Sequence, residues 1–530
     1  MRKTFGITFI VLLLLAVPSS STNAQSKPQV SELLTAAERT QFEETTSYAE
    51  VMSFIHTATE ASPNLHLSSF GYSLEGRELP LVIFGNVNDA TAESILNSGK
   101  LRVFIQANIH AGEVCGKEAL LAMIRDMAQG KYAELLNEMV VIMAPIYNAD
   151  GNERVNLFNR PRQNGPIGGM GQRPNAQGLD LNRDHMKVKS PEARSLIRLF
   201  NEYDPHVVVD LHTTNGTRHA YHITYSTPLN PNTDQGIDSF LRDVWMKDVT
   251  NTIRNKVGWE YYYYGNLPFR PGDAGWYTFD HRPRFNNNYV GLRNRMAILS
   301  EGYAYATFEE RILATRYFVE EILAFASTHR NQIEELVSKA DQVRLTGTEL
   351  GVRFEPKMNS EATEILMGAV DVLTNPYSGA TYFERKDTVY TQVMPEYGAF
   401  QATETSRVPA NYYVSAAAAS LVGAYLDTHG ISYSVLKSTR DVDVESFTVE
   451  SSEAAENEFQ QIKERTLTGT YAKQNVELEV GSLQISTDQP LARLAFYLLE
   501  PRSDDGLVNW AQMDKWSAVG SIYPIYRSLE

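Results

Sequence analysis

The sequence predicts an α/β fold, a sheet flanked by helices, followed by a second domain that is mixed α/β or β-rich. Apolar strand-like runs alternate with longer amphipathic runs between residues 101 and 211, which is the pattern of α/β layer folds. The 530 residues are 43% hydrophobic and exceed the about 100–200 residues of one domain. After about Ile333, Thr and Val become frequent and short alternating runs indicate strands.

The predicted elements follow from apolar periodicity and turn residues. A helix over Thr46 to Glu60 precedes a hairpin of Leu65 to Phe70 and Leu79 to Phe84. The alternating strand and helix runs are Leu101 to Ala107, Glu118 to Met127, Met139 to Pro145, Pro191 to Tyr203 and His206 to Leu211. A long helix over Ile237 to Val257, a strand over Met296 to Ser300 and a helix over Phe308 to His329 complete the first domain. In the second, Asn475 to Ile485 is strand-like and Ala417 to Thr428 predicts a lone helix.

The first 24 residues have the pattern of a secretory signal. Arg2 and Lys3 precede an apolar run from Ile7 to Val17, and cleavage fits after Ala24. The alternative, a membrane anchor, needs about 20 apolar residues, more than this run supplies. We therefore expect a signal at 1–24, a catalytic domain at 25–335 and an accessory domain at 336–530, with export to the periplasm or the extracellular space.

Charge and cysteine content restrict the partners. The formal net charge is −16, which disfavours binding to nucleic acid or to an anionic membrane. A single cysteine, Cys115, excludes an internal disulfide. Its neighbours Val114 and Gly116 indicate packing rather than a catalytic thiol. Small molecules or peptides are therefore the expected partners.

Three side chains with the chemistry of zinc ligands follow two predicted strands. His110 and Glu113 come just after the strand that ends at Ala107, and His212 follows the strand that ends at Leu211. Ligands bind at the carboxyl ends of strands in open α/β sheets. Imidazole and carboxylate suit zinc, and three protein ligands with an open fourth position are typical of a catalytic site. The His-x-x-Glu pair alone is a weak signal, since eleven histidines produce such pairs by chance.

Glu301 ends the third strand of this set, Met296 to Ser300. The apolar strand behind it predicts a dry environment that raises the pKa of a carboxyl group toward the catalytic range. The alternative is a capping or surface acid near Thr307, a role that Glu309 and Glu310 fit better.

The run Asp180-Leu181-Asn182-Arg183 follows a long polar loop between Gly151 and Gly178, of the kind that often has a function. Asp180 could orient a zinc-bound imidazole. An arginine beside an asparagine can hold a planar carboxylate with two parallel hydrogen bonds. The alternative is a surface cluster of ion pairs.

Taken in order, the motifs resemble those of the zinc metallocarboxypeptidases of the carboxypeptidase A type. They are Ser73-x-Glu75-Gly76-Arg77, His110-x-x-Glu113, Asn148-Ala149-Asp150-Gly151, Asn182-Arg183, His212 and Glu301. The resemblance covers roughly Thr46 to His329 and implies a mixed twisted sheet flanked by helices.

The resemblance also implies roles for single residues. His110, Glu113 and His212 match the ligands of one zinc ion, and Glu301 matches the catalytic glutamate. Arg162 is similar to the arginine that stabilises the oxyanion. Asn182 and Arg183 match the pair that grips the terminal carboxylate of the substrate, and Asp180 matches the acid that supports the first zinc histidine.

Two departures from the family pattern stand out. Position 112 is Gly where many digestive relatives have Arg, so a secondary substrate contact is missing there. The mobile tyrosine of the family has no clear match between Gly272 and Arg295; Tyr289 and Tyr277 are the candidates, and we prefer Tyr289 for its polar Asn-rich setting.

The expected function is hydrolysis of the last peptide bond of peptides or proteins by an activated water. One alternative is a zinc amidohydrolase that cuts γ-D-glutamyl bonds in cell-wall peptides with the same ligands. The other is a carboxypeptidase-like binding module without catalysis, which the intact Glu301 and ligand set argue against.

Overall fold

The computed structural model describes residues 30–214, 216–268 and 274–529. The predicted signal at 1–24 lies outside the described residues, and export stays a prediction. Among the described residues, no helix combines the length and the apolar character needed to cross a membrane.

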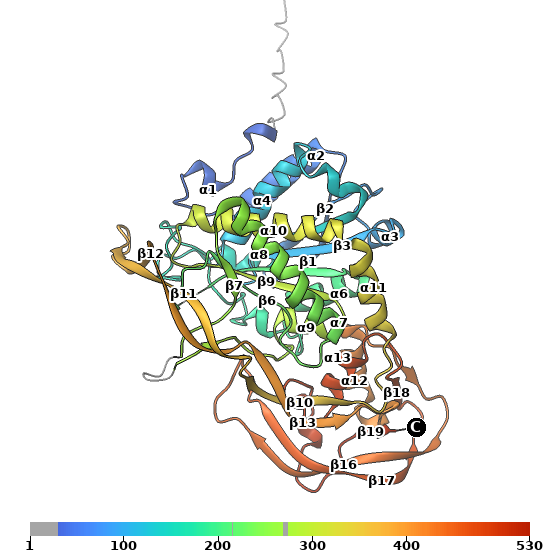
Figure 1. The fold of residues 1–530 in the computed structure, drawn as a ribbon. Helices are drawn as coiled ribbons and strands as arrows, with labels where there is room; N and C mark the ends of the chain where they lie inside the picture. Colours follow the sequence, from blue (N-terminus) through green and yellow to red (C-terminus); the bar gives the residue numbers. More distant parts are fainter. Residues whose placement is uncertain (1–29, 215, 269–273, 530) are drawn as a thin grey trace, which may run out of the picture.

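A mixed eight-stranded sheet forms the centre of the first half of the chain, in the order β1-β2-β4-β3-β5-β9-β6-β7 (Figure 1). The neighbours β4, β3, β5 and β9 run parallel, while β1 and β2 form the predicted antiparallel hairpin. The strands are β1 (Leu65–Tyr72), β2 (Glu78–Phe84), β3 (Leu101–Ala107), β4 (Met139–Ala144), β5 (Val207–Thr213), β6 (Ile223–Ser226), β7 (Tyr261–Tyr263) and β9 (Met296–Gly302). The predicted mixed α/β fold is confirmed.

Helices cover both faces of this sheet. Those helices and helical turns are η1 (Val30–Glu32), α1 (Ala36–Arg39), α2 (Tyr48–Ala61), α3 (Ala92–Asn97), α4 (Cys115–Ala128), η2 (Ala133–Asn137), α5 (Ala149–Asn152), η3 (Leu181–Arg183), α6 (Pro191–Tyr203), α7 (Gln235–Ser239), η4 (Phe240–Trp245), α8 (Met246–Val257), α9 (Asn286–Leu292), α10 (Phe308–Thr328) and α11 (Arg330–Gln342). The single helix predicted over Ile237 to Val257 is interrupted by η4, a π-helical turn. The predicted domain boundary at 335 falls within α11.

Local chemistry fixes where the longer helices begin. Ser47 and Glu50 form a capping box at the start of α2, and Thr307 caps α10. Ser190 caps α6 just before Pro191, which is favoured in the first turn because it has no N–H to leave unpaired. These caps explain why the predicted helices begin within a few residues of the observed ones.

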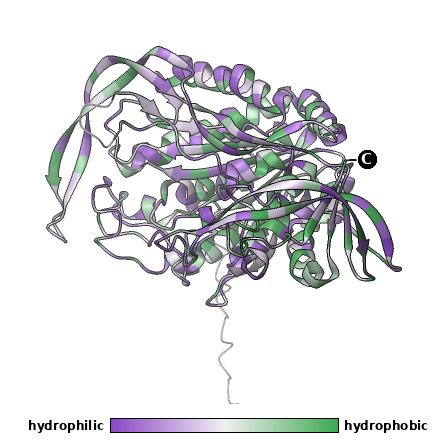
Figure 2. Ribbon diagram, turned by 90° about the horizontal axis from the view of Figure 1, so that it is seen from below, coloured by the Kyte–Doolittle hydropathy of each residue, from purple (hydrophilic) through white to green (hydrophobic). Residues whose placement is uncertain are grey.

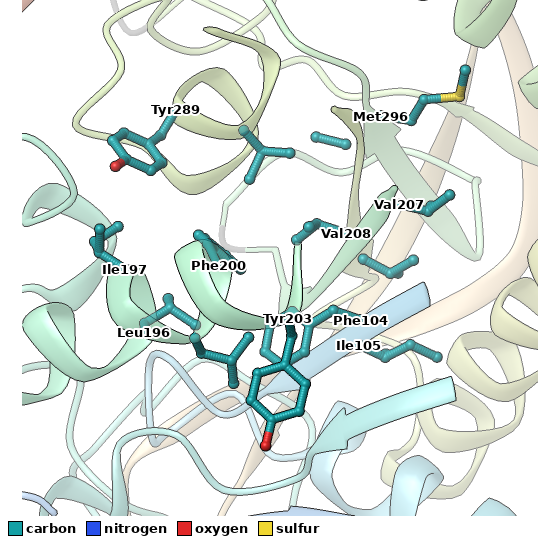
Figure 3. Close-up of a cluster of buried hydrophobic side chains, with 14 of the residues drawn as sticks. Phe104, Ile105, Leu196, Ile197, Phe200, Tyr203, Val207, Val208, Tyr289 and Met296 are labelled. Atoms are coloured by element: carbon teal, nitrogen blue, oxygen red, sulfur yellow. The ribbon is translucent and has the colours of Figure 1, made fainter. Parts of the chain in front are cut away.

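Close packing of α4 and α6 on opposite faces of the sheet positions the strand ends. On one face, a Cβ at Gly116 in α4 would lie 2.6 Å from Cβ of Leu211, so the helix backbone lies directly on β5. On the other face, Phe200 of α6 meets the ring of Phe104 edge-on at 5.7 Å. Figure 3 shows this second cluster, in which Val208 and Tyr289 also lie. The core therefore holds β3 and β5 rigidly where they end.

The remaining chain is β-rich, as predicted, and most of it lies below the central sheet in Figure 1, while β11 and β12 extend along the left side of the molecule to the level of that sheet. It contains a two-stranded sheet (β10, β13), a three-stranded sheet that β8 joins (β11, β12, β8) and a six-stranded sheet in the order β15-β18-β14-β19-β16-β17. Its long outer strands contain both hydrophilic and hydrophobic residues (Figure 2), and the middle of β12 is exposed over several consecutive residues.

The strands of this accessory region are β10 (Glu349–Lys357), β11 (Ser360–Thr374), β12 (Thr381–Tyr397), β13 (Ala399–Arg407), β14 (Asn411–Val414), β15 (Ser434–Val435), β16 (Arg440–Ala454), β17 (Arg465–Leu478), β18 (Leu483–Ser486) and β19 (Ile525–Ser528). The short strand β8 (Trp276–Tyr277), which pairs with β12, comes from the first half of the chain. Its helices are α12 (Ala416–His429), α13 (Ala492–Leu499) and η5 (Asp514–Trp516). The helix predicted near Ala417 to Thr428 is present, but it is not alone. All residues of α13 are buried, so it lacks the amphipathic period that reveals a surface helix.

Candidate active site

The predicted ligands and Glu301 meet at one edge of the central sheet. His110 and Glu113 lie in the tight turn between β3 and α4, closed by a hydrogen bond from the Glu113 amide to the His110 carbonyl at 2.8 Å. His212 lies in β5 and is the register partner of Glu301 in the parallel neighbour β9. The parallel order β3-β5-β9 thus brings these side chains together from positions up to 191 residues apart.

His110, Glu113 and His212 form a buried cluster in which one ligand atom from each lies within 4.8 Å of the others. Oε1 of Glu113 lies 3.0 Å from Nδ1 of His110, and Oε2 lies 2.9 Å from Nδ1 of His212. The two Nδ1 atoms are 3.3 Å apart. Both imidazoles therefore present the same nitrogen to the same carboxylate.

The opposite nitrogen of each histidine contacts a second carboxylate. Nε2 of His110 lies 2.9 Å from Asp180, and Nε2 of His212 lies 2.9 Å from Asp210. Such pairs fix the tautomer with a proton on Nε2 and a free lone pair on Nδ1, the arrangement that supports zinc-binding histidines. The donor set and its outer partners therefore fit a zinc ion.

Asp210 was not predicted as a site residue. Asp210 and His212 are two residues apart on β5, so their side chains lie on the same face of the sheet. Burial opposes the charged form of His212, but Asp210 and Glu113 outweigh it and raise the pKa of His212 well above its usual range. The period-two rule applied to Asp210-x-His212 could have found this residue.

Glu301 has the environment expected of a proton-transfer group. Burial, with a further contribution from the negative charge of Glu113, raises the pKa of Glu301 to about 8. Its Oε2 is buried and, among the described residues, has no hydrogen-bond partner. Glu301 is therefore not a capping acid; Thr307 caps α10 through the Glu310 amide.

A cavity of about 500 Å³ opens onto the cluster. Its walls are formed by the three candidate ligands, by Glu301, and by Arg160, Arg173, Asn182, Arg183, Thr213, Tyr264, Phe279, Phe285 and Leu299. Ligand sites of this size usually combine apolar walls with a few convergent polar groups, as here.

Asn182 and Arg183 both line this cavity. Arg183 places its guanidinium 3.8 Å above the ring of Phe285 and donates to the Asn182 carbonyl at 2.6 Å. The Asn182 side-chain oxygen accepts from the Asn286 amide at 2.9 Å. Asp180 caps the η3 turn that contains both residues, accepting from the Asn182 amide at 2.9 Å.

The structure does not bring Arg162 into this cavity. Arg162 lines a neighbouring cavity of about 340 Å³, together with residues such as Thr214 and Tyr305. Arg173 instead lies in the metal-site cavity, 2.7 Å from Asp180 and 3.6 Å from Glu113. The path of the loop between Gly151 and Gly178, rather than its sequence, decides which arginine lines the metal-site cavity, and in this structure it is Arg173 and not Arg162.

Arg160 also lies in the cavity and pairs with Glu113. A Cβ at position 112 would lie 2.8 Å from the Gly171 carbonyl and 3.0 Å from Cγ of Arg160. A side chain at position 112 would therefore meet the Gly171 backbone and Arg160, whose guanidinium already lies in the cavity beside Glu113.

Tyr289 cannot contact a substrate in this structure. It is fully buried, and its hydroxyl lies 2.8 Å from Nδ1 of His429. The Asn-rich setting that favoured it is the buried helix α9. Tyr277 stacks on Tyr397 at 4.3 Å and is not part of the cavity wall. The tyrosine that lines the cavity is Tyr264, which was not predicted.

The other family motifs have structural contacts. Asp150 accepts from Ser73 at 2.6 Å, from the Glu75 amide at 3.0 Å and from Arg77 at 2.7 Å. These bonds join the first hairpin to the loop after β4. Cys115 is buried beside Thr213, in agreement with a packing role.

The fold and the buried His–Glu–His cluster fit a hydrolase that uses a metal ion. A family model described as zinc carboxypeptidase matches residues 51–266. Residues 51–266 therefore belong to the zinc carboxypeptidase family, and the enzyme is a metallocarboxypeptidase.

Curated relatives and solved structures share this family name. Carboxypeptidase 2 of Trichophyton tonsurans is 25% identical over 86% of this chain and 81% of its own length, and Carboxypeptidase 2 of Trichophyton rubrum is 24% identical over 86% and 81%. A metallo-carboxypeptidase from Burkholderia cenocepacia aligns with 53% of this chain and 70% of its own, at 15% identity and a TM-score of 0.41.

Proposed function

We propose that this chain is a zinc-dependent carboxypeptidase that hydrolyses the C-terminal peptide bond of peptides or proteins. The observation that supports it best is that the His110–Glu113–His212 cluster, Glu301 and Arg183 all face one cavity. The cavity thus combines a site for a metal ion, a proton-transfer group and a carboxylate-binding group.

His110 and His212, through Nδ1, and Glu113, through its carboxylate, would hold the metal ion. When bound there, zinc lowers the pKa of water and polarises a carbonyl group. Asp180 and Asp210 keep both imidazoles in the tautomer that leaves Nδ1 free.

Glu301 accepts the proton of the attacking water and returns it to the nitrogen of the leaving amine. Proton transfer of this kind needs a group whose pKa lies near the working pH, and the buried setting of Glu301 provides one. Glu301 in β9 is paired with His212 in the adjacent strand β5, and this pairing keeps Glu301 beside the candidate metal ligands.

Arg173 stabilises the negative charge that develops on the carbonyl oxygen. Its side chain is held by Asp180 while remaining 37% exposed toward the cavity. A donor that is already oriented stabilises a developing charge without reorganisation during the reaction. Arg173 takes the role that the family resemblance gave to Arg162.

Asn182 and Arg183 bind the terminal carboxylate and so place only the last peptide bond at the metal. The guanidinium of Arg183 is supported from below by Phe285, which fixes the plane in which its N–H groups point. A planar carboxylate can then accept two parallel hydrogen bonds. Exopeptidase specificity follows from this contact.

The test compares peptides with free and amidated C-termini, each with and without a zinc chelator. We expect cleavage of the free peptide alone, and none after chelation. Equal cleavage of the amidated peptide would exclude binding of the terminal carboxylate by Asn182 and Arg183, the pair called the carboxylate clamp below. Full activity in the presence of the chelator would exclude a requirement for the metal ion. Cleavage of γ-D-glutamyl peptides but not of peptides with ordinary peptide bonds would favour the alternative that the enzyme is a zinc amidohydrolase. Binding of peptides without turnover would favour the alternative that the domain is a binding module without catalysis.

The aromatic part of the cavity predicts which C-terminal residue is accepted. Phe279 lies 5.4 Å from Tyr264 and 5.2 Å from Phe285, and Leu299 completes an apolar wall beside Arg183. Among the described residues, the only carboxylates in the cavity wall are those of Glu113 and Glu301. The proposed mechanism assigns the first to the metal ion and the second to proton transfer, so no further carboxylate is left to pair with a basic side chain. We expect kcat/KM for a peptide ending in Phe to exceed that for the same peptide ending in Lys by at least about tenfold. Equal values would contradict this assignment.

A further inference from the structure

A tight turn of the accessory region touches the loop that contains Asp180. Gln460 and Gln461 form the turn, between Phe459 and Ile462, which exchange backbone hydrogen bonds of 2.8 and 3.0 Å. Both glutamines are left-handed, with φ of +52° and +63°. Turns with two left-handed residues strongly favour Asn and Gly, so glutamine here is conformationally unfavourable. Such strain is typical of functional positions.

Gln460 accepts a hydrogen bond that controls the position of Asp180. Its Oε1 lies 2.7 Å from the backbone nitrogen of Asp180, 280 residues away in sequence. The carboxylate of the same Asp180 contacts His110 at 2.9 Å and Arg173 at 2.7 Å, and it caps the turn that contains Asn182 and Arg183. The side chain of Gln460 therefore holds the backbone of Asp180. The carboxylate of Asp180 in turn contacts His110 and caps the turn that contains the carboxylate clamp.

Gln461 holds the same loop at a second point. Its Nε2 donates to the Gln177 carbonyl at 2.7 Å, and its Oε1 accepts from Lys189 at 3.1 Å. Gln177 precedes Asp180 in sequence and Lys189 follows it. The side chain of Gln461 is therefore hydrogen-bonded to the chain on both sides of Asp180.

The flanks of the turn contact the opposite wall of the cavity. Glu464, just after the turn, accepts from Arg284 at 2.6 Å, and the Arg284 guanidinium lies 5.2 Å above the Phe459 ring. Arg284 directly precedes Phe285, the ring beneath Arg183. The contacts of residues 459–464 thus reach both sides of the clamp.

We infer that the turn Phe459–Ile462 is part of the active site, and that Gln460 is a positioning residue that orients Asp180 and, through it, His110 and the Asn182–Arg183 pair. The inference rests on the proposed function for its catalytic consequence but not for its effect on metal binding. It assigns the accessory region a role in assembling the site.

The test separates positioning from folding. Gln460→Gly removes the acceptor but suits the left-handed backbone, so the melting temperature is expected to stay within about 3 °C of the wild type. Metal affinity, measured by competition with a chromophoric chelator, is expected to fall about tenfold, as for the loss of other outer partners of a ligand. Gln460→Glu retains the acceptor oxygen and is expected to keep most of this affinity. Lys463→Ala, an exposed neighbour, is the control.

The outcomes are distinct. Unchanged metal affinity and unchanged kcat in Gln460→Gly would overturn the inference. A fall in affinity that Gln460→Glu restores would support it, even if no peptide proved to be a substrate, because metal binding is measured independently of hydrolysis. Failure of the proposed function alone would instead appear as a wild type that binds metal without cleaving free C-termini.

Discussion

Glu301→Gln is expected to reduce kcat by about 10²–10⁴-fold, the usual contribution of a general acid–base group. The amide keeps the shape of the side chain but cannot accept the proton of the attacking water. Metal content should be unchanged, because Glu301 is not one of the three candidate ligands. Steady-state kinetics with a matched metal analysis checks both points.

The matched control is Glu309→Gln, which changes an exposed acid at the start of α10 and should leave kcat within about twofold of the wild type, as for ordinary surface substitutions. Wild-type turnover in Glu301→Gln would exclude Glu301 as the proton acceptor.

The pH profile gives the same assignment a second readout. Burial raises the pKa of Glu301 to about 8 in the absence of a cation, and a bound divalent cation lowers it by Coulomb attraction. Because the ionised form accepts the proton, kcat/KM should rise with pH through an ionisation below 8 and flatten above it.

Arg173→Met is expected to reduce kcat by about 10²–10³-fold, the cost of removing one oriented donor to an oxyanion. Arg162→Met is the matched control, and it should retain activity within about threefold, because Arg162 lines the neighbouring cavity. Binding of zinc must be measured in both variants, since Arg173 also contacts Asp180. A larger loss in Arg162→Met than in Arg173→Met would reverse the two roles.

The sequence predicts the residues at the ends of strands much better than those in loops. His212 and Glu301 follow apolar runs whose direction and neighbours are decided by the α/β pattern. Once β3, β5 and β9 are recognised as strands of one sheet, their ends converge. The strand pattern places the candidate ligands and Glu301 at one edge of the sheet, and the family resemblance supplies their expected roles.

Arg162 and Tyr289 show why the remaining positions could not be predicted. Arg160, Arg162 and Arg173 occupy one long loop, and only the fold of that loop, with Arg160 packed against Gly112, decides which of them face the metal site. Tyr289 was chosen for polar neighbours in sequence, but helix α9 buries that whole segment. Polar composition does not distinguish a surface loop from a buried, fully hydrogen-bonded helix.

Gln460 represents a third class of residue. Nothing in its own neighbourhood resembles a catalytic motif, and its partner is 280 positions earlier in the chain. Contacts between such distant segments depend on how separately formed sheets pack together, which periodicity does not reveal.

The parallel pairing of β5 with β9 and the late position of the Gln460–Gln461 turn also set an order of assembly during synthesis. All the proposed catalytic residues have been synthesised once residue 301 is made, whereas the acceptor for Asp180 follows about 160 residues later, on the order of ten seconds or more at usual elongation rates. With the role inferred for Gln460, the chain therefore completes its metal-binding and substrate-binding residues well before it makes the segment that orients them.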